Sequence, residues 1–273
     1  IDDTDDVCLS SYAPPRNWWI SDSSNDIDSD GCRDADEDLD DDGDGFDDAA
    51  DDCNKITGTS TLGSYQGCVD TDGDGWADLE DTCPNSAGNS TLGGAIGCPD
   101  SDGDGWSDDD DAFDNDPTQW DDSDGDGYGD NQDGTNPDAC INVAGTSVLD
   151  RYGCPDPDSD GYSSEAVGWT VEDGADAFPL DETQWSDWDE DGFGDNFANI
   201  SWLDRNTNWP GEYYQYARDQ DSCPTLPGTS WQDDILGCPD SDGDGWANFM
   251  DGFPSDPDEH LDSDGDGVAD GAD

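Results

Sequence analysis

The sequence predicts a chain ordered by disulfides and bound cations in place of a hydrophobic core, built as a calcium-stapled, disulfide-looped repeat array. Its 273 residues include 75 Asp and Glu against 6 Lys and Arg, which gives a formal net charge of −69. Leu, Ile, Val and Phe make up about 12% of the chain, a composition typical of disordered proteins. The chain nevertheless carries 12 Trp and 10 Cys, in which disordered tails are poor. Cross-links and bound cations are therefore the candidates for ordering it.

The charge also excludes some partners. Nucleic acid and anionic membrane surfaces would repel this chain directly. No apolar run approaches the roughly 18 residues of a transmembrane helix, and no signal peptide stands at Ile1. We expect no membrane insertion and a mature or excised piece of a protein.

The cysteine spacing predicts short disulfide loops. Consecutive pairs lie 24, 15, 15, 14 and 15 residues apart, and similar segments such as Gly-Thr-Ser precede the second cysteine of the four short pairs. Equal spacing around a repeated motif favours consecutive pairing, and thiolate metal ligands would need Cys-x-x-Cys knuckles that the chain lacks. Disulfides in this number predict an extracellular or cell-surface location. The predicted disulfides are Cys8–Cys32, Cys53–Cys68, Cys83–Cys98, Cys140–Cys154 and Cys223–Cys238.

Between the cysteine loops runs a second motif, Asp-x-Asp-x-Asp-Gly-x-x-Asp-x-x-Asp. Calcium takes 6 to 8 oxygen ligands, so carboxylates at positions 1, 3, 5, 9 and 12 and a backbone carbonyl at position 7 can encircle one ion. Acidic low complexity would scatter Asp without register, whereas nine loops here keep the register, which predicts at least eight or nine calcium ions. Magnesium demands a tighter octahedral geometry, and zinc would need His and Cys ligands.

Six copies keep an oxygen ligand at every position, with Asn248 as the ninth residue of one of them. Position 7 repeatedly carries an aromatic ring, which we expect to pack against the neighbouring disulfide loop. The predicted ligands of these copies are Asp40, Asp42, Asp44, Phe46, Asp48 and Asp51; Asp70, Asp72, Asp74, Trp76, Asp78 and Asp81; Asp100, Asp102, Asp104, Trp106, Asp108 and Asp111; Asp122, Asp124, Asp126, Tyr128, Asp130 and Asp133; Asp240, Asp242, Asp244, Trp246, Asn248 and Asp251; and Asp262, Asp264, Asp266, Val268, Asp270 and Asp273.

Three further copies depart from the motif. Ser164 and Val167 replace the last two ligands of one loop, Ala198 replaces the last ligand of another, and an insertion follows each. The third copy contains Cys32. The predicted ligands of these copies are Asp156, Asp158, Asp160 and Tyr162; Asp187, Asp189, Asp191, Phe193 and Asp195; and Asp26, Asp28, Asp30, Asp34 and Glu37.

The combination resembles the thrombospondin type-3 repeat, in particular the long acidic versions of bacterial and archaeal surface proteins. The runs that carry the resemblance are typified by 68–76 (Cys-Val-Asp-Thr-Asp-Gly-Asp-Gly-Trp) and 81–84 (Asp-Thr-Cys-Pro). The resemblance covers nearly the whole chain and implies an elongated chain wrapped around a string of calcium ions with little regular secondary structure. EF-hands share the first loop positions, but the Cys-Pro and Gly-rich flanks here would break their helices. The longer disulfide loops and the insertions depart from the animal family, whose partners are therefore uninformative.

The motifs divide the chain into five segments. A linker that starts with Phe and ends with Trp120 recurs with Trp185, and a third copy places His260 at the same position, which predicts a packing role for this histidine. The rings of the second insertion either cover the degraded loops or form a contact patch for a partner or glycan. The predicted segments are 1–39 (N-terminal, with the Cys8–Cys32 loop), 40–99 (two 30-residue repeats), 100–155 (double calcium unit), 156–239 (double unit with aromatic insertions at 163–172 and 197–218) and 240–273 (truncated double unit).

No catalytic constellation can be assembled from this sequence, so we expect no enzyme. The leading hypothesis is a calcium-rigidified extracellular structural protein, either a fibre subunit or a surface stalk. A calcium-dependent adhesion module that binds carbohydrate or a partner and a calcium-storing acidic protein are the alternatives. Asn89 and Asn199 lie in N-glycosylation sequons, which predicts a glycoprotein.

The two ends of the sequence predict self-association. The loop Asp262–Asp273 stops where comparable loops continue to Asp-x-Cys, and Ile1–Cys8 carries such an ending without a loop before it. We expect a head-to-tail contact between copies, which would propagate into a filament if it does not close. The alternative is that 273 residues are one period of a longer chain. The ligands offered by the next copy would be Asp2, Asp3, Asp5 or Asp6.

Overall fold

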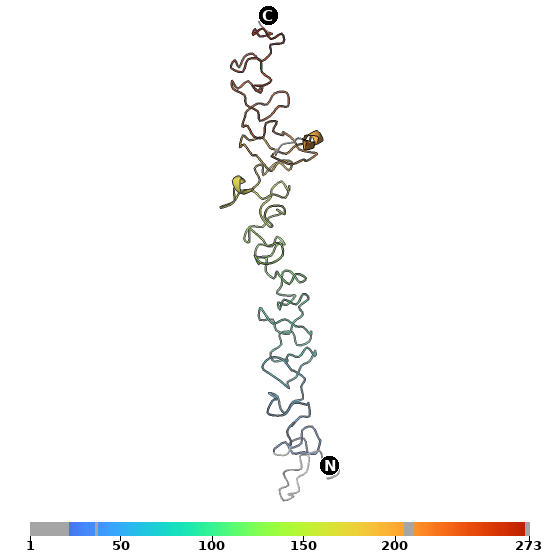
Figure 1. Ribbon diagram of the computed structural model, residues 1–273. Coiled ribbons are helices and arrows are strands. Elements are labelled where there is room, and N and C mark those ends of the chain that lie inside the picture. Colours follow the sequence, from blue (N-terminus) through green and yellow to red (C-terminus); the bar gives the residue numbers. More distant parts are fainter. Residues whose placement is uncertain (1–21, 36–37, 205–209, 271–273) are drawn as a thin grey trace. The chain divides into compact units, whose positions relative to one another are not determined.

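The structure is a computed structural model that describes residues 22–35, 38–204 and 210–270 (Figure 1). Regular secondary structure in these ranges consists of two 3₁₀ helices, η1 (Val171–Asp173) and η2 (Ile200–Asp204), and a few isolated β-bridges. The predicted scarcity of regular secondary structure is therefore confirmed. Neither helix is long and apolar enough to cross a membrane.

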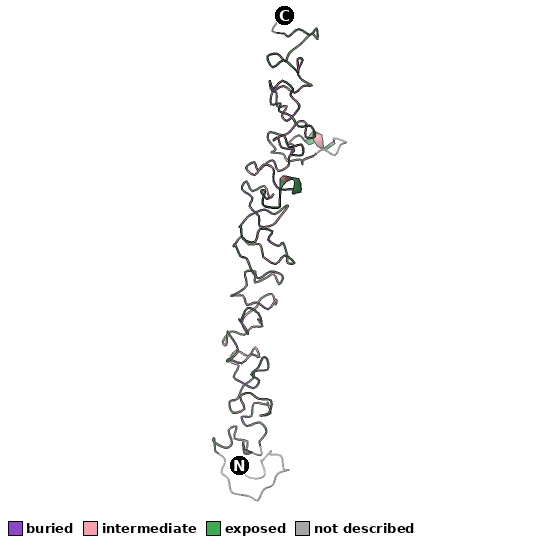
Figure 2. Ribbon diagram, turned by 90° about the vertical axis from the view of Figure 1, so that its left-hand side faces the viewer, coloured by how far each residue is buried: buried purple, intermediate pink, exposed green. Residues whose placement is uncertain are grey.

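The chain forms two compact units. The first comprises Ile1–Asp121 with Asp133–Thr135, and the second comprises Asp122–Gln132 with Asn136–Asp273. Buried residues alternate with exposed ones along the ribbon in both units (Figure 2). The buried apolar residues are cystines and alanines with Phe197 and Pro224, while most of the largest fully buried side chains are polar. The described residues of the two units thus form no hydrophobic core of the usual kind.

Four of the five predicted disulfides are confirmed. The Cα atoms of Cys53–Cys68, Cys83–Cys98 and Cys223–Cys238 are 5.0 Å apart, and those of Cys140–Cys154 are 5.1 Å apart. Cys8 of the fifth predicted pair, Cys8–Cys32, lies outside the described residues.

A buried serine organises the interior of each disulfide loop. The Ser60 hydroxyl donates to the Tyr65 carbonyl at 2.5 Å and accepts the Cys68 N–H at 2.9 Å. Because Ser60 is fully buried, these two bonds satisfy its hydroxyl and close the loop onto its second cysteine. Three further serines make the same pair of bonds: Ser90, Ser147 and Ser230.

Two glycines in each disulfide loop allow close backbone approach. A Cβ atom at Gly58 would lie 2.2 Å from the Cys68 carbonyl, so no side chain fits at this position. Gly67, with φ of +72°, faces a carboxylate, and its Cβ would lie 2.2 Å from Asp51 Oδ1. The Gly-Cys pair therefore brings the disulfide loop against the last carboxylate of the preceding acidic loop.

The rings at position 7 pack in the way the sequence predicts, in small clusters. A Cβ atom at Gly63 of the first short disulfide loop would lie 2.6 Å from the Trp76 ring, which shows how closely the ring covers that loop. Elsewhere the ring stacks on the last residue of the linker. Stacked pairs are Trp106–Trp120 (centroids 6.3 Å apart), Tyr162–Trp185 (5.2 Å) and Trp246–His260 (4.6 Å). His260 thus packs where the other linkers carry Trp, as predicted.

The serine bonds generate the first prediction. Replacing Ser60 by Ala leaves the buried Cys68 N–H and Tyr65 carbonyl without partners, which should lower the free energy of unfolding by about 1–3 kcal/mol. Denaturant unfolding and amide exchange at Cys68 measure the effect. The matched control is Thr59→Ala, because Thr59 is exposed and its hydroxyl bonds no described residue. Equal behaviour of the two variants would contradict the assignment.

Candidate metal centre

Each acidic loop folds around its own carboxylates. In the loop that begins at Asp70, Oδ1 of Asp70 accepts the Gly73 N–H at 2.8 Å and Oδ2 accepts the Gly75 N–H at 3.0 Å. Asp74 Oδ1 accepts the Trp76 N–H at 2.9 Å. The loops that begin at Asp100 and Asp240 repeat these bonds. The backbone therefore positions the carboxylates at loop positions 1 and 5.

The first three carboxylates of a loop converge. One oxygen from each lies within 4.8 Å of the others, a spacing that could hold a metal ion. Such groups, all predicted ligands, include Asp26/Asp28/Asp30, Asp40/Asp42/Asp44, Asp70/Asp72/Asp74 and Asp100/Asp102/Asp104. Asp34, Asp38 and Asp41 form another group of this kind, of which the sequence predicted Asp34 alone.

The predicted ligands at position 9 close the loop. Asp78 accepts the Thr71 N–H at 2.8 Å on one oxygen and the Thr71 hydroxyl at 2.7 Å on the other. Ser or Thr at position 2 makes both bonds in three more loops, to Asp108, Asp130 and Asp270. Asp34, Asp48, Asp195 and Asn248 accept the position-2 N–H. The sequence did not predict this loop-closing role.

Where the last carboxylate of a loop is among the described residues, it faces the first three. Asp81 Oδ1 accepts the Cys83 N–H at 2.7 Å, and its pKa is raised by burial and by the nearby charges of Asp74, Asp72 and Asp78. Asp51 and Asp111 make the same contact with the residue two positions later, and so does Asp251. This geometry fits the predicted ligand at position 12.

In four loops the last carboxylate comes from outside the twelve-residue motif, and three of these residues have nearly the same environment. Asp138, Asp176 and Asp221 each accept the N–H of the residue two positions later, at 2.6 to 2.7 Å, as Asp81 does. Each lies close enough to its loop's first carboxylates for their charges to raise its pKa. The sequence had assigned Asp133 to the first of these three loops and no final ligand to the other two.

A readable signal for these residues exists in the sequence. Asp138 and Asp221 stand in Asp-x-Cys, and Asp176 stands in the similar Asp-Ala-Phe. Asp38 holds the same place in the loop that begins at Asp26, since its Oδ1 accepts the Asp40 N–H at 3.0 Å. A search that expects the final ligand at loop position 12 misses all four residues, because extra residues precede the final carboxylate in these loops.

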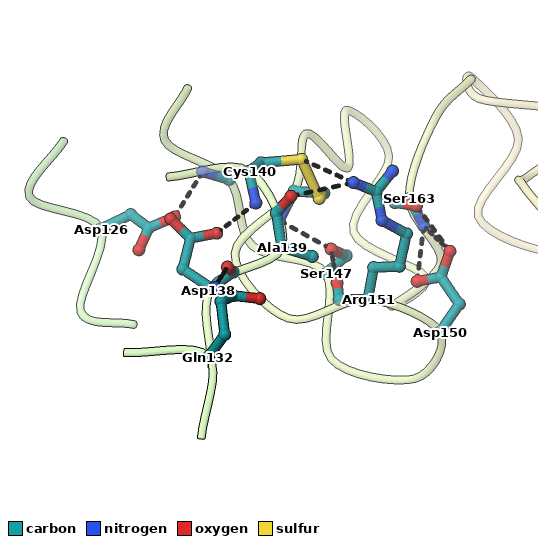
Figure 3. Close-up of a disulfide and its surroundings, with 11 residues drawn as sticks. Asp126, Gln132, Asp138, Ala139, Cys140, Ser147, Asp150, Arg151 and Ser163 are labelled. Carbon is teal, nitrogen blue, oxygen red and sulfur yellow. Dashed lines mark hydrogen bonds between the residues drawn. A yellow bond between two sulfur atoms is a disulfide. The ribbon is translucent and has the colours of Figure 1, made fainter. Parts of the chain in front are cut away.

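Figure 3 shows the surroundings of Asp138, beside the Cys140–Cys154 disulfide. The Asp138 carboxylate accepts the Cys140 N–H, and Asp126 in the same view accepts the N–H of Gly145 at 2.8 Å. A Cβ atom at Gly153 would lie 2.3 Å from Asp138 Oδ1 and 3.2 Å from Asp126 Oδ2. The glycine thus leaves the space in which the two carboxylates approach one another.

Many of these carboxylate oxygens are buried without a hydrogen-bond donor. Among the described residues, 24 side-chain N and O atoms are buried and have no partner, and 19 of them are aspartate oxygens. Position 3 contributes an unpaired oxygen in seven loops: Asp42, Asp72, Asp102, Asp124, Asp158, Asp189 and Asp242. Final carboxylates contribute Asp38, Asp51, Asp138, Asp176, Asp221 and Asp251. A bound cation would satisfy these oxygens, whereas leaving them unpaired is costly.

The carbonyl predicted at position 7 is also free. Across the described loops, the carbonyls of the eight position-7 residues accept no backbone hydrogen bond, whereas the preceding glycine carbonyl often accepts two, as Gly75 does from Thr61 and Leu62. The carbonyl at position 7 is thus left available to a metal ion. All candidate ligand atoms in these sites are oxygens, which hard cations such as calcium and magnesium prefer.

Burial beside other carboxylates raises several pKa values in the metal-free sites. The pKa rises to about 6 for Asp138 and Asp160, to about 7 for Asp176 and Asp195, and to about 8 for Asp221. Burial is the main cause in each, and neighbouring carboxylates add to it. At neutral pH a metal-free site therefore retains protons that a bound cation would displace.

Some predictions fall outside the described residues. They are the ligands Glu37 and Asp273 and the chain ends of the predicted head-to-tail junction, Ile1–Cys8 and 271–273. Both predicted sequon asparagines are described, and Asn89 and Asn199 are exposed.

The raised pKa values generate a second prediction. A carboxyl whose folded-state pKa exceeds its unfolded value stabilises the fold below the unfolded value, and this stability is lost as the pH rises through the folded value. The free energy of unfolding of the metal-free protein should therefore fall between about pH 4 and pH 8. Denaturant unfolding in chelator measures it, followed upward from about pH 4 to the pH at which the metal-free chain expands without denaturant. Asp221→Asn keeps an oxygen that accepts the Cys223 N–H and removes the carboxyl that titrates. The free energy of unfolding of this variant should therefore fall less as the pH rises. Identical pH profiles for the variant and the unchanged chain would refute this.

Comparison with known proteins assigns no family to this chain. No protein-family model matches the chain, and no curated protein matches it.

Proposed function

We propose that the chain is a calcium-binding structural protein of the extracellular space, similar to thrombospondin type-3 repeats, in which calcium holds the acidic loops in their folded form. The observation that carries the proposal is the set of buried aspartate oxygens without donors, at the same positions of successive loops. Each set also includes a free backbone carbonyl at position 7. Hydrogen bonds orient the remaining oxygens in the folded loops.

The arrangement supports calcium over other metals. A loop such as the one that begins at Asp70 offers Asp72 Oδ2, Asp81 and the Trp76 carbonyl together with oxygens of Asp70 and Asp74. Five or more oxygens in an irregular backbone suit calcium, whose coordination number and geometry vary, better than octahedral magnesium. Zinc is disfavoured because the loops contain neither His nor free Cys.

The energetics support a structural role for the ions. Extracellular calcium modules have dissociation constants of roughly 10⁻⁴ to 10⁻³ M, so at tenfold excess one site adds about 1.4 kcal/mol. Nine independent sites would add on the order of 13 kcal/mol, which equals the whole stability of an ordinary domain. The four disulfides fit the extracellular space. A calcium-storage protein would not need its carboxylates at regular positions, whereas these loops repeat the same hydrogen bonds.

Removal of calcium tests the proposal directly. Chelation should abolish the near-ultraviolet circular dichroism of the stacked Trp106–Trp120 pair and expand the chain toward a disulfide-pinned coil, because the carboxylates then repel one another. Calcium should restore both properties, and an equal concentration of magnesium should restore less. A spectrum and hydrodynamic size that chelator leaves unchanged would contradict the proposal.

A single substitution tests the newly placed ligands. Asp176→Asn should reduce the number of calcium ions bound per chain by about one, because Asp176 completes the loop that begins at Asp156. Equilibrium dialysis with calcium measures the number. The matched control is Glu182→Gln, which also converts a carboxylate to an amide but at an exposed position. Equal loss in both variants, or none in either, would remove Asp176 from the ligand set.

A further inference from the structure

Both insertions of the second unit meet at one cavity of about 380 Å³. Val171 of η1, with Gly174 and Ala175, forms one wall, and Pro210 and Gly211 of the second insertion form another. The Gly211 backbone lies so close that a Cβ atom there would be 2.1 Å from the Asp195 carbonyl. The insertions are therefore folded against the acidic loop.

Aromatic rings line the same cavity. Tyr162 and Trp185 are stacked with an interplanar angle of 14°, and both contribute to the lining. Trp188 also lines the cavity and is 74% exposed, whereas the other described acidic loops carry no ring at position 2. An exposed indole beside a cavity presents a flat apolar face to a ligand.

Polar groups stand beside these rings. Because position 2 of this loop is Trp188 in place of Ser or Thr, Asp195 Oδ2 accepts the Trp188 backbone N–H at 2.8 Å and no position-2 hydroxyl adds a second bond. Asp195 Oδ1 and the Ser186 hydroxyl are buried and form no hydrogen bond of normal geometry with each other or with another described residue. Both residues line the cavity. The combination of flat rings with carboxylate and hydroxyl groups is the one that small-molecule sites use for orientation.

The positions of the insertions link the cavity to the acidic loops. The first insertion lies between Tyr162 and Asp176, and the second lies between Asp195 and Asp221. The members of each pair belong to one candidate calcium site, so an ion bound there would fix both ends of the inserted segment. Further bonds hold the second insertion in place: Glu212 N–H to Asn196 Oδ1 at 3.0 Å, and Gln184 Nε2 to the Arg218 carbonyl at 2.7 Å.

We propose that this cavity binds a neutral sugar ring, and that it does so when the two adjoining loops hold calcium. A pyranose places its C–H face on an indole and donates its hydroxyls to carboxylate and hydroxyl oxygens, which matches Trp188, Asp195 and Ser186. The net charge of −69 disfavours anionic ligands, including phosphates and sulfated sugars. The calcium dependence rests on the proposed function, since ions would neutralise Asp187 and Asp195 and reduce the attraction for an amine.

Saturation-transfer difference NMR tests the site on the calcium-loaded chain, with millimolar methyl glycosides of glucose, galactose, mannose and N-acetylglucosamine as probes. At least one glycoside should receive magnetisation, and the signal should vanish in Trp188→Ala. This variant keeps the backbone N–H that Asp195 accepts and removes only an exposed ring. The matched control is Phe249→Ala, which removes a ring that is 65% exposed and does not line the cavity. Its signal should equal that of the unchanged chain.

Calcium titration of the same samples separates the two proposals. If calcium binds and no glycoside gives a signal, the sugar site is refuted while the calcium proposal stands. If calcium does not bind, the proposed function fails. A glycoside signal that persists in chelator refutes the calcium dependence. If trimethyl-lysine binds and no glycoside does, and if this binding is lost in Trp188→Ala, the cavity is a cation site and the sugar proposal is refuted. By linkage, a bound glycoside should raise calcium affinity by the factor by which calcium raises glycoside affinity.

Discussion

Convergence of aspartate carboxylates in each acidic loop is the constraint on which the rest of this structure depends. Like charges repel one another, and buried oxygens without donors cost free energy, so the loops are stable only when protons or cations compensate them. The part of the chain that the structure describes has no hydrophobic core that could oppose this repulsion. Protons supply the compensation in part, as the pKa of about 8 at Asp221 shows, and calcium would supply it at neutral pH.

The disulfide loops and the acidic loops depend on each other. Each second cysteine follows a glycine whose missing side chain makes room for a final carboxylate, as at Gly67 and Asp51. In return, Asp44 and its equivalents accept an N–H from the following disulfide loop, here Gly58 at 2.9 Å. Covalent closure limits how far each loop can open, while the carboxylates fix its conformation. Order therefore arises from many small local contacts along the chain.

The insertions show how such a chain can acquire further functions. Residues enter between the seventh and the final positions of a loop, and the final carboxylate returns to the same place, as Asp176 and Asp221 demonstrate. Lengthening a loop costs little closure entropy, so an inserted segment is tolerated when its ends remain fixed. Both insertions in the second unit border one cavity, which makes this stretch the part of the chain with its own binding chemistry.

The sequence by itself determined the features that depend on short spacing. The disulfides, the carboxylates at positions 1, 3 and 5, and the stacking of His260 were readable because their partners recur at fixed separations. Tertiary structure decided which later residue completes a loop. Asp221 follows Asp187 after a long insertion, and Asp78 turns toward Thr71, which no count of residues reveals. Backbone geometry limits what a short loop can do, whereas a long insertion can return anywhere, so only the folded chain shows where its end lies.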